Sequence, residues 1–186
     1  MDRMSPICRL QGLMLVELLV ALALMGVLLL VVAPGMQYLI QSNRIQAEVG
    51  RLMAAINLVR SEALRRNHPV TMCPSAAAQT GEPVCGGSYA GGWIVFADSD
   101  RDRLVDPGEQ LIRVFDALPG GFSLTNRAGT RDAVETITYL PDGTSGRNRT
   151  LLLCAPPGSR ASSRSVVMNI VGRPRLAMGW GTCPGA

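Results

Sequence analysis

An acidic stretch near the middle of the chain carries the residue types and the spacing of a calcium-binding loop. Acids stand at positions 1, 3, 5, 9 and 12 of the twelve-residue EF-hand template, and the apolar Val105 stands at position 8. Carboxylate oxygens are the hard ligands that calcium prefers, and the Leu104 carbonyl would add another oxygen. The candidate calcium ligands are Asp98, Asp100, Asp102, Asp106 and Glu109.

Two features of the same stretch favour a different interpretation. The sixth position of the template is normally glycine, because the loop turns sharply there, but in this chain it is Arg103. The flanking segments also have strand patterns and not the helical patterns of an EF-hand. The alternative is a solvated acidic hairpin whose carboxylates pair with Arg101 and Arg103.

A second group of charges lies in the C-terminal part of the chain. Every basic residue of this protein is arginine, and no acid follows Asp142. Clustered arginines could neutralise nucleic-acid phosphates without reading base sequence, and such binding would be sensitive to salt. The other interpretation is an arginine-rich face that contacts another protein or water. The arginines after Asp142 are Arg147, Arg149, Arg160, Arg164, Arg173 and Arg175.

Four cysteines after the N-terminal region predict two disulfides. The N-terminal apolar run described below predicts export, and an even number of cysteines in an exported domain normally pairs, because the compartment is oxidising. Three pairings are possible for Cys73, Cys85, Cys154 and Cys183. Local closure favours Cys73 with Cys85, which leaves Cys154 and Cys183 to fasten the C-terminal tail.

Residues for catalysis are not evident. The single histidine, His68, stands beside Pro69 at the expected end of a helix, and no phosphate-binding glycine loop or nucleophile motif occurs. We therefore expect a protein that is not an enzyme, and calcium is the one cofactor that the sequence suggests.

The N-terminal region predicts a membrane anchor that contains one acid. The run from Leu13 to Ala33 is long enough, at about 1.5 Å per residue, to cross a hydrocarbon core about 30 Å thick. The arginines before this run favour a cytoplasmic N-terminus, with the remainder outside. Glu17 would cost about 2.5–3.5 kcal/mol if it were unpaired at the bilayer centre. We infer that it has a partner, and the obvious candidate is a new positive N-terminus made by cleavage after Gly12.

One long helix is expected to carry this anchor into the rest of the chain. It is predicted from Leu13 to Asn67, with a kink at Pro34-Gly35 and an end at His68-Pro69. Its first half is apolar all round, which suits lipid or a helical bundle. Its second half has an apolar stripe that suits packing against a sheet. That stripe consists of Val49, Leu52, Ile56, Val59 and Ala63.

After Pro69 the pattern changes to short strands separated by turn residues. The order of a helix followed by strands predicts an α+β fold with an antiparallel β-sheet. The stretch Ser75–Gly92 is expected to be a loop. The predicted strands are Val70–Cys73, Trp93–Ala97, Gln110–Phe115, Phe122–Thr125, Val134–Leu140, Arg149–Ala155, Ser165–Val171 and Arg175–Met178.

The N-terminal junction resembles the class III signal of type IV pilins and type II secretion pseudopilins. The resemblance consists of Gly12 before the cut, an apolar start at Leu13, Glu17 as the fifth residue of the mature chain, and Pro34 further along. It implies that a prepilin peptidase cuts after Gly12 and methylates the amine of Leu13. It also implies that Glu17 pairs with the N-terminus of a neighbouring subunit during assembly.

The remainder of the chain resembles the GspH/FimT group of minor pilins and pseudopilins. The matching pieces are Arg60-Ser61-Glu62-Ala63, Arg66-Asn67, Cys73, Gly92-Trp93-Ile94-Val95-Phe96 with an acidic loop after it, and Gly172-Arg173-Pro174-Arg175. The resemblance implies a type IV pilin-like fold. It divides the chain into a leader (1–12), a transmembrane assembly helix (13–34), its amphipathic continuation (35–68) and a β-rich domain (69–186).

The function implied by this resemblance is that of a structural subunit. It would be anchored in the inner membrane by a single pass, with its C-terminal domain in the periplasm, and would move to the tip of a type II secretion pseudopilus or a type IV pilus. Its implied partners are other minor and major pilins or pseudopilins, the prepilin peptidase, the inner-membrane assembly platform and lipid. An alternative is a DNA-binding minor pilin for DNA uptake, in which Arg173 and Arg175 contact DNA.

Overall fold

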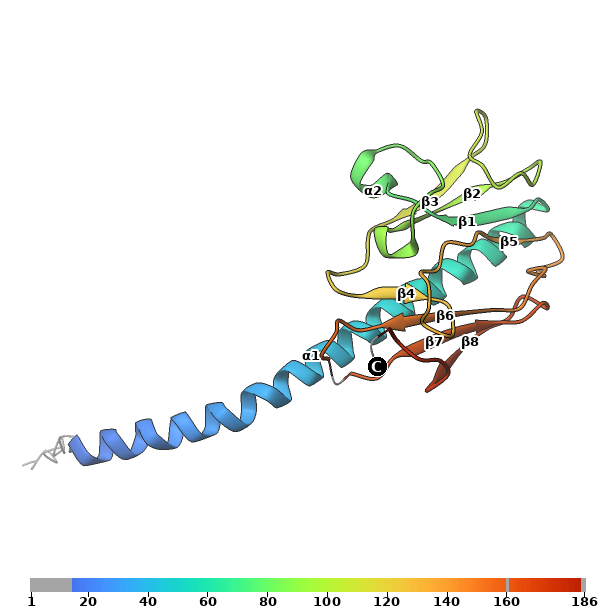
Figure 1. The fold of residues 1–186 in the computed structure, drawn as a ribbon. Helices are drawn as coiled ribbons and strands as arrows, with labels where there is room; N and C mark the ends of the chain where they lie inside the picture. Colours follow the sequence, from blue (N-terminus) through green and yellow to red (C-terminus); the bar gives the residue numbers. More distant parts are fainter. Residues whose placement is uncertain (1–14, 160, 185–186) are drawn as a thin grey trace, which may run out of the picture. The chain divides into compact units, whose positions relative to one another are not determined.

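The computed structural model describes residues 15–159 and 161–184. The order of elements is one long helix and then strands, as the sequence predicts (Figure 1). Helix α1 (Leu15–Arg66) is followed by two very short helices, α2 (Ala77–Thr80) and η1 (Tyr89–Gly91). The strands are β1 (Val70–Pro74), β2 (Trp93–Ala97), β3 (Leu111–Phe115), β4 (Ser123–Thr125), β5 (Ile137–Tyr139), β6 (Arg149–Cys154), β7 (Arg164–Met168) and β8 (Pro174–Met178).

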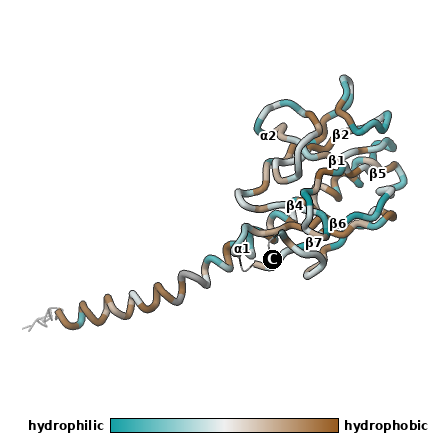
Figure 2. The backbone as a smooth tube through the Cα atoms, in the orientation of Figure 1, coloured by the Kyte–Doolittle hydropathy of each residue, from teal (hydrophilic) through white to brown (hydrophobic). Residues whose placement is uncertain are grey.

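The chain forms two compact units, one as far as Leu39 and the other from Ile40 onward. The described part of the first unit is helical throughout, without a break at Pro34 or Gly35. Figure 2 shows that hydrophobic residues predominate along it. This helix is long and apolar enough to cross a membrane, and its most apolar window is not buried within the structure. The predicted kink at Pro34 stays a prediction.

The end of α1 follows from its last residues. Asn67 has a φ of 53°, in the left-handed region that asparagine tolerates better than most residues, and it directly follows the last helical residue, Arg66. His68 and Pro69 come next, so the predicted end of the helix is confirmed to within one residue. The predicted start at Leu13 lies outside the described residues.

The strands form two antiparallel sheets, whereas the order of a helix followed by strands predicted one. The first has the order β3-β2-β1-β5 and the second the order β4-β6-β7-β8. The predicted strand Val134–Leu140 is wrong in extent. Only Ile137–Tyr139 pairs with β1. Asp132, just before the predicted strand, bridges Thr125 of β4, and the Leu140 amide donates to the Thr144 carbonyl in the turn that follows.

The core lies between the second half of α1 and both sheets. The predicted helical stripe is confirmed, since Val49, Leu52, Ile56, Val59 and Ala63 are all buried. They pack in one cluster with β1, β2 and β5 of the first sheet and with β4, β6 and β7 of the second. Burying one such side chain stabilises the fold by about 1.5–3 kcal/mol. The domain therefore depends on the second half of α1.

The segment from Ser75 to Gly92 is not the plain loop that the sequence predicted. It contains α2 and η1 and covers the outer face of the first sheet, where Cys73, Ile94 and Phe96 form a second small buried cluster. A disulfide joins Cys73 to Cys85 across this segment. A second disulfide joins Cys154 of β6 to Cys183. These are the two pairings that local closure favoured.

Candidate functional site

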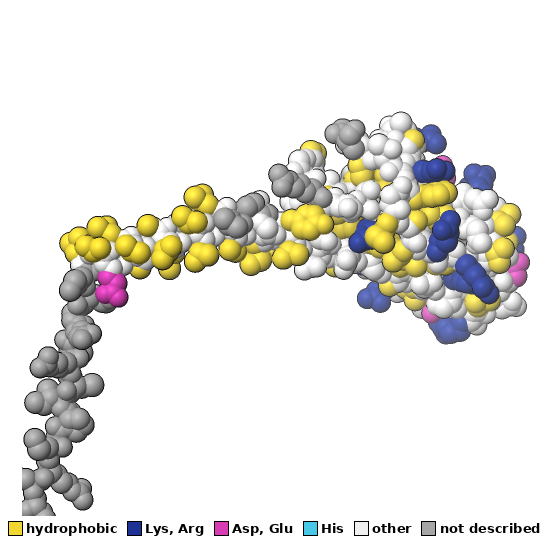
Figure 3. Space-filling view, turned by 90° about the horizontal axis from the view of Figure 1, so that it is seen from below, with side chains coloured by type: hydrophobic (Ala, Val, Ile, Leu, Met, Phe, Trp, Pro, Cys, Tyr) yellow, Lys and Arg dark blue, Asp and Glu magenta, His cyan; other side chains and the backbone are white. Residues whose placement is uncertain are grey.

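The first candidate site is the acid in the apolar helix. Glu17 lies in the first described turn of α1, where it is exposed, as are Leu15 and Val16 beside it. Figure 3 shows an acidic group at this end of the helix among hydrophobic side chains. It is the only charged residue between Leu15 and Gln41. An acidic side chain near a helix N-terminus also complements the helix dipole.

The predicted partner of Glu17 is not among the residues that the structure describes. Gly12 and Leu13, the predicted cleavage and methylation positions, lie outside them. Both therefore stay predictions. The side chains of the first unit that are described are exposed on all sides, which is the surface expected of a helix that lies in lipid or in a bundle.

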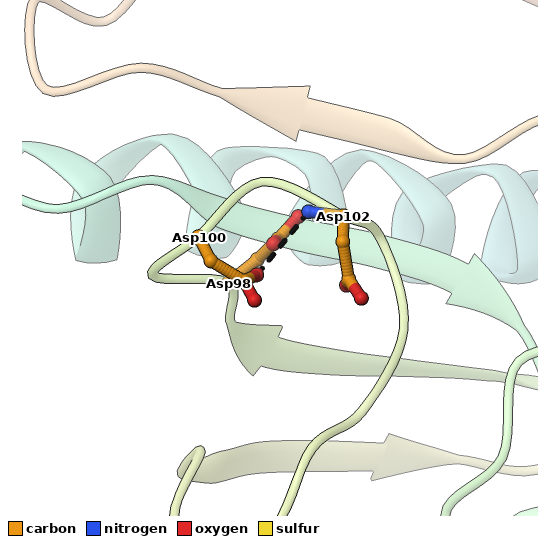
Figure 4. Close-up of side chains that lie close together, drawn as sticks. All are labelled: Asp98, Asp100 and Asp102. Atoms are coloured by element: carbon orange, nitrogen blue, oxygen red, sulfur yellow. Dashed lines mark hydrogen bonds between the residues drawn. The ribbon is translucent and has the colours of Figure 1, made fainter.

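The acidic loop brings three of its five candidate ligands together. Three carboxylate oxygens, one from each of Asp98, Asp100 and Asp102, lie within 4.8 Å of one another (Figure 4). Asp98 is buried, and its Oδ2 accepts a 2.5 Å hydrogen bond from the Thr71 hydroxyl of β1. Asp100 and Asp102 are exposed. The base of the loop is thus tied to the sheet, while its tip is open to solvent.

The backbone of this loop explains how arginine is accepted at the template's glycine position. Both Arg101 and Arg103 have a φ of 68°, in the left-handed region. For a residue with a Cβ this conformation costs roughly 1–2 kcal/mol. The loop offsets that cost with side-chain bonds to its backbone. The Asp100 carboxylate accepts from the Asp102 amide at 3.2 Å, and the Asp102 carboxylate accepts from the Leu104 amide at 2.7 Å.

The other two candidate ligands are placed differently. Glu109 accepts from the Ser99 amide at 2.8 Å and from the Asp106 amide at 3.3 Å, so its carboxylate closes the loop on itself. Asp106 is half-buried, and its carboxylate is not part of the three-oxygen cluster. The negative charge of Asp102 raises the pKa of Asp106, with smaller contributions from burial and from Asp100 and Asp98.

This loop yields a prediction for calcium and pH. The raised pKa of Asp106 means that the folded state disfavours its ionised form. The neighbouring carboxylates repel ionised Asp106 at pH values above this pKa, and protonation of Asp106 removes the repulsion at lower pH. Calcium bound to Asp98, Asp100 and Asp102 would remove that repulsion. We expect millimolar calcium, but not magnesium, to raise the Tm at neutral pH and to have little effect near about pH 4.

The matched variants are Asp100→Asn with Asp102→Asn, and Asp116→Asn, which removes an exposed acid outside the loop. The double variant should abolish the rise in Tm that calcium causes, and Asp116→Asn should leave that rise intact. An unchanged Tm of the wild-type chain in calcium would contradict the calcium interpretation and leave the solvated hairpin.

The basic C-terminal tract is spread over different surroundings. Arg173 lies in the turn before β8 and is exposed. Arg175 lies on β8, with its guanidinium carbon 5.9 Å from the Trp180 ring. It helps to line a hollow of about 590 Å³ that also includes Arg127, Arg131 and Arg149, together with the acids Asp132 and Glu135. Arg160 lies outside the described residues.

The contribution of Arg127 and Arg131 could not be seen in the sequence. They come from the connection between β4 and β5, far from the C-terminal arginines along the chain. The amide of Thr182 donates to the Arg127 carbonyl at 3.1 Å, and the Arg127 guanidinium carbon lies 4.3 Å from the Trp180 ring. Tertiary folding of the tail, held by the second disulfide, makes this grouping.

The glycine of Gly172-Arg173-Pro174-Arg175 has a structural role of its own. Gly172 has a φ of 78°, and a Cβ at this position would lie 2.1 Å from the Gly143 carbonyl oxygen. The Tyr139 hydroxyl donates to the Gly172 carbonyl at 2.9 Å. The turn before β8 is therefore packed tightly against the turn after β5, and only glycine fits.

Comparisons with known proteins agree with this architecture. The family model described as "Type II transport protein GspH" matches residues 48–172. No curated protein matches the chain significantly. The type IV minor pilin FimU of Pseudomonas aeruginosa (strain PAO1) has a similar structure, with a TM-score of 0.51, 19% identity, and coverage of 73% of this chain and 89% of that chain.

A minor pseudopilin, EpsH from the Type 2 Secretion System of Vibrio cholerae, also matches. Its TM-score is 0.49 at 12% identity, with 77% of this chain and 99% of that chain covered. At these identities the likeness to FimU shows the fold, while the family match extends over more than half of the chain. This protein therefore belongs to the GspH family of minor pilins and pseudopilins.

Proposed function

We propose that this protein is a non-enzymatic subunit of a type II secretion pseudopilus or a type IV pilus, anchored in the inner membrane before assembly. The observation that carries the proposal is the combination of a GspH-family domain with an apolar helix that contains a single acid, Glu17. A globular domain alone would not need such a helix, and a plain anchor would not need the acid.

The two parts of α1 would serve two purposes in this proposal. The residues up to Leu39 hold the chain in lipid and then pack with the helices of other subunits. The residues from Ile40 onward form the spine of the domain, whose outer surfaces contact neighbouring minor subunits. The domain would lie in the periplasm and reach the filament tip after assembly.

A deletion experiment tests this function. Removing the gene from its host should abolish either secretion through the type II pathway or the yield of pili in the sheared fraction, and a plasmid copy should restore it. The process that is lost identifies the filament. Normal secretion together with a normal yield of pili would contradict the proposal.

DNA binding is a second candidate function, favoured by the position of Arg175. It lines a hollow with three other arginines and lies beside Trp180, which is 40% exposed and could stack on a base. Asp132 and Glu135 in the same hollow oppose a polyanion. Binding would therefore be weak and would depend on phosphate contacts.

The test for DNA binding uses the full chain in a non-ionic detergent. The binding constant for duplex DNA should fall as the salt concentration rises. The double variant Arg173→Ala with Arg175→Ala should reduce the slope of log K against log salt concentration by about 0.9 for each phosphate that it no longer neutralises. Arg113→Ala on β3, which removes an exposed arginine elsewhere, is the control. Binding that is independent of salt, or unchanged in the double variant, would exclude this function for the motif.

A further inference from the structure

A second, smaller hollow is lined by four arginines from two separate segments of the chain. Arg101 and Arg103 come from the acidic loop, while Arg147 and Arg149 come from the start of β6 and the turn before it. Its volume is about 240 Å³. Among the described residues no carboxylate lines it. The remaining lining residues are Thr138, Leu140, Ser145 and Gly146.

Positive charges act on Arg149 from two of the other arginines, Arg147 and Arg103. Arg149 is the least exposed, with 14% of its side chain accessible. Burial lowers the pKa of its guanidinium, Glu135 and Tyr89 raise it, and the positive charges of Arg147 and Arg103 lower it by smaller amounts. Glu135 opposes this effect, but it lies 3.7 Å away, is 61% exposed and does not line the hollow. Among the described residues, the lining therefore has four arginines and no carboxylate, while Asp100 and Asp102 alternate with Arg101 and Arg103 along the loop.

The walls of the hollow are fixed by hydrogen bonds. Arg149 donates to the Thr136 carbonyl, and the Ser145 hydroxyl donates to the Asn169 carbonyl at 2.9 Å. The Thr138 hydroxyl lies 2.7 Å from the hydroxyl of Thr71, which in turn donates to Asp98 at the base of the acidic loop. This chain of bonds connects β5 with the loop that supplies Arg101 and Arg103.

We propose that this hollow binds a phosphate group. A phosphate carries up to two negative charges and at least three strong acceptor oxygens, so it can accept from several guanidinium forks at once. A carboxylate has one charge and two oxygens, and would leave part of this cluster uncompensated. Arginine is also the side chain best suited to bidentate contacts with phosphate.

Neither Arg173 nor Arg175 lines the proposed site, although it shares Arg149 with the larger hollow that Arg175 lines. The phosphate could be a free ion or part of a small phosphomonoester such as a lipid head group. The site is a property of the folded chain, so its test does not depend on filament assembly.

The experiment measures the Tm of the full chain in a non-ionic detergent by tryptophan fluorescence. Inorganic phosphate, glycerol phosphate and chloride are compared at equal ionic strength, which separates specific binding from screening. Phosphate should raise the Tm and chloride should not. A response to glycerol phosphate as well would show that a head group is admitted, and a response to inorganic phosphate alone would assign the free ion.

Variants locate the binding to the hollow. The triple variant combines Arg101→Gln, Arg103→Gln and Arg147→Gln. The phosphate concentration that gives half of the maximal rise in Tm should increase by at least about tenfold in this variant, because charge-assisted hydrogen bonds are removed. Arg149 is left in place because it holds Thr136. Arg147→Gln alone changes one exposed side chain and serves if the triple variant does not fold. Arg113→Gln is the control, with the same change of charge elsewhere.

Three results would overturn the proposal. The first is an equal shift in phosphate and chloride. The second is a phosphate response that is unchanged both in the triple variant and in Arg147→Gln. The third is a response to a glutamate-rich peptide without one to phosphate, which would assign the hollow to an acidic protein partner instead.

Discussion

Glu17→Ala is expected to leave the chain in the membrane but to reduce its amount in filaments by at least about tenfold, because the variant loses the free energy gained when this carboxylate is paired on assembly. The residue lies in the first described turn of an exposed apolar helix and has no charged neighbour on that helix as far as Gln41. Its loss would remove the attraction to the N-terminal amine of the next subunit. The measurement is the ratio of the chain in the sheared filament fraction to that in the membrane fraction.

Two controls separate assembly from processing. Leu19→Ala changes a neighbouring exposed side chain of the same helix without changing charge, and should incorporate normally. Gly12→Leu should block cleavage, whereas Glu17→Ala should still be cleaved. If the Glu17→Ala chain enters filaments at the wild-type level, the pairing role assigned to this acid is wrong.

Gly172→Ala should destabilise the domain by roughly 2–5 kcal/mol, because left-handed strain and overpacking add. The added Cβ would lie 2.1 Å from the Gly143 oxygen and 2.8 Å from Cε1 of Tyr139. Neither neighbour can move easily, since one is backbone and the other is a fully buried ring. The free energy of unfolding from urea denaturation measures the effect.

Gly179→Ala is the matched control for Gly172→Ala. Gly179 also has a positive φ, 65°, but an added Cβ there would meet nothing within 4 Å. It should cost only the strain, about 1 kcal/mol. Equal losses in the two variants would show that the contact with Gly143 contributes nothing. If Gly172→Ala is strongly destabilised, a loss of DNA binding in that variant would reflect unfolding of the domain and would not show a direct contact with DNA.

The features that sequence reasoning could predict are those with local causes. The stripe from Val49 to Ala63 follows from helical periodicity, and the helix end follows from His68-Pro69. The Cys73–Cys85 disulfide follows from short separation along the chain. In each case the residues that matter are near one another in sequence, so spacing alone determines the geometry.

The features that it could not predict come from contacts between distant segments. Nothing in the strand patterns divides them into two sheets, because that division depends on which strands pair. The same holds for the hollow of four arginines, whose members lie on the acidic loop and near β6. The sequence also did not show that the Glu109 carboxylate closes the loop by accepting from the Ser99 and Asp106 amides. These hydrogen bonds compete with the metal-ligand role that its spacing suggested.

We propose that this GspH-family chain is cut after Gly12 and assembled into a filament through its N-terminal helix. The most direct test is the intact mass of the chain isolated from sheared filaments. The expected mass is that of a chain that begins at Leu13 and carries one added methyl group on its amine. A chain that retains residues 1–12, or a filament fraction without the chain, would contradict this processing and assembly.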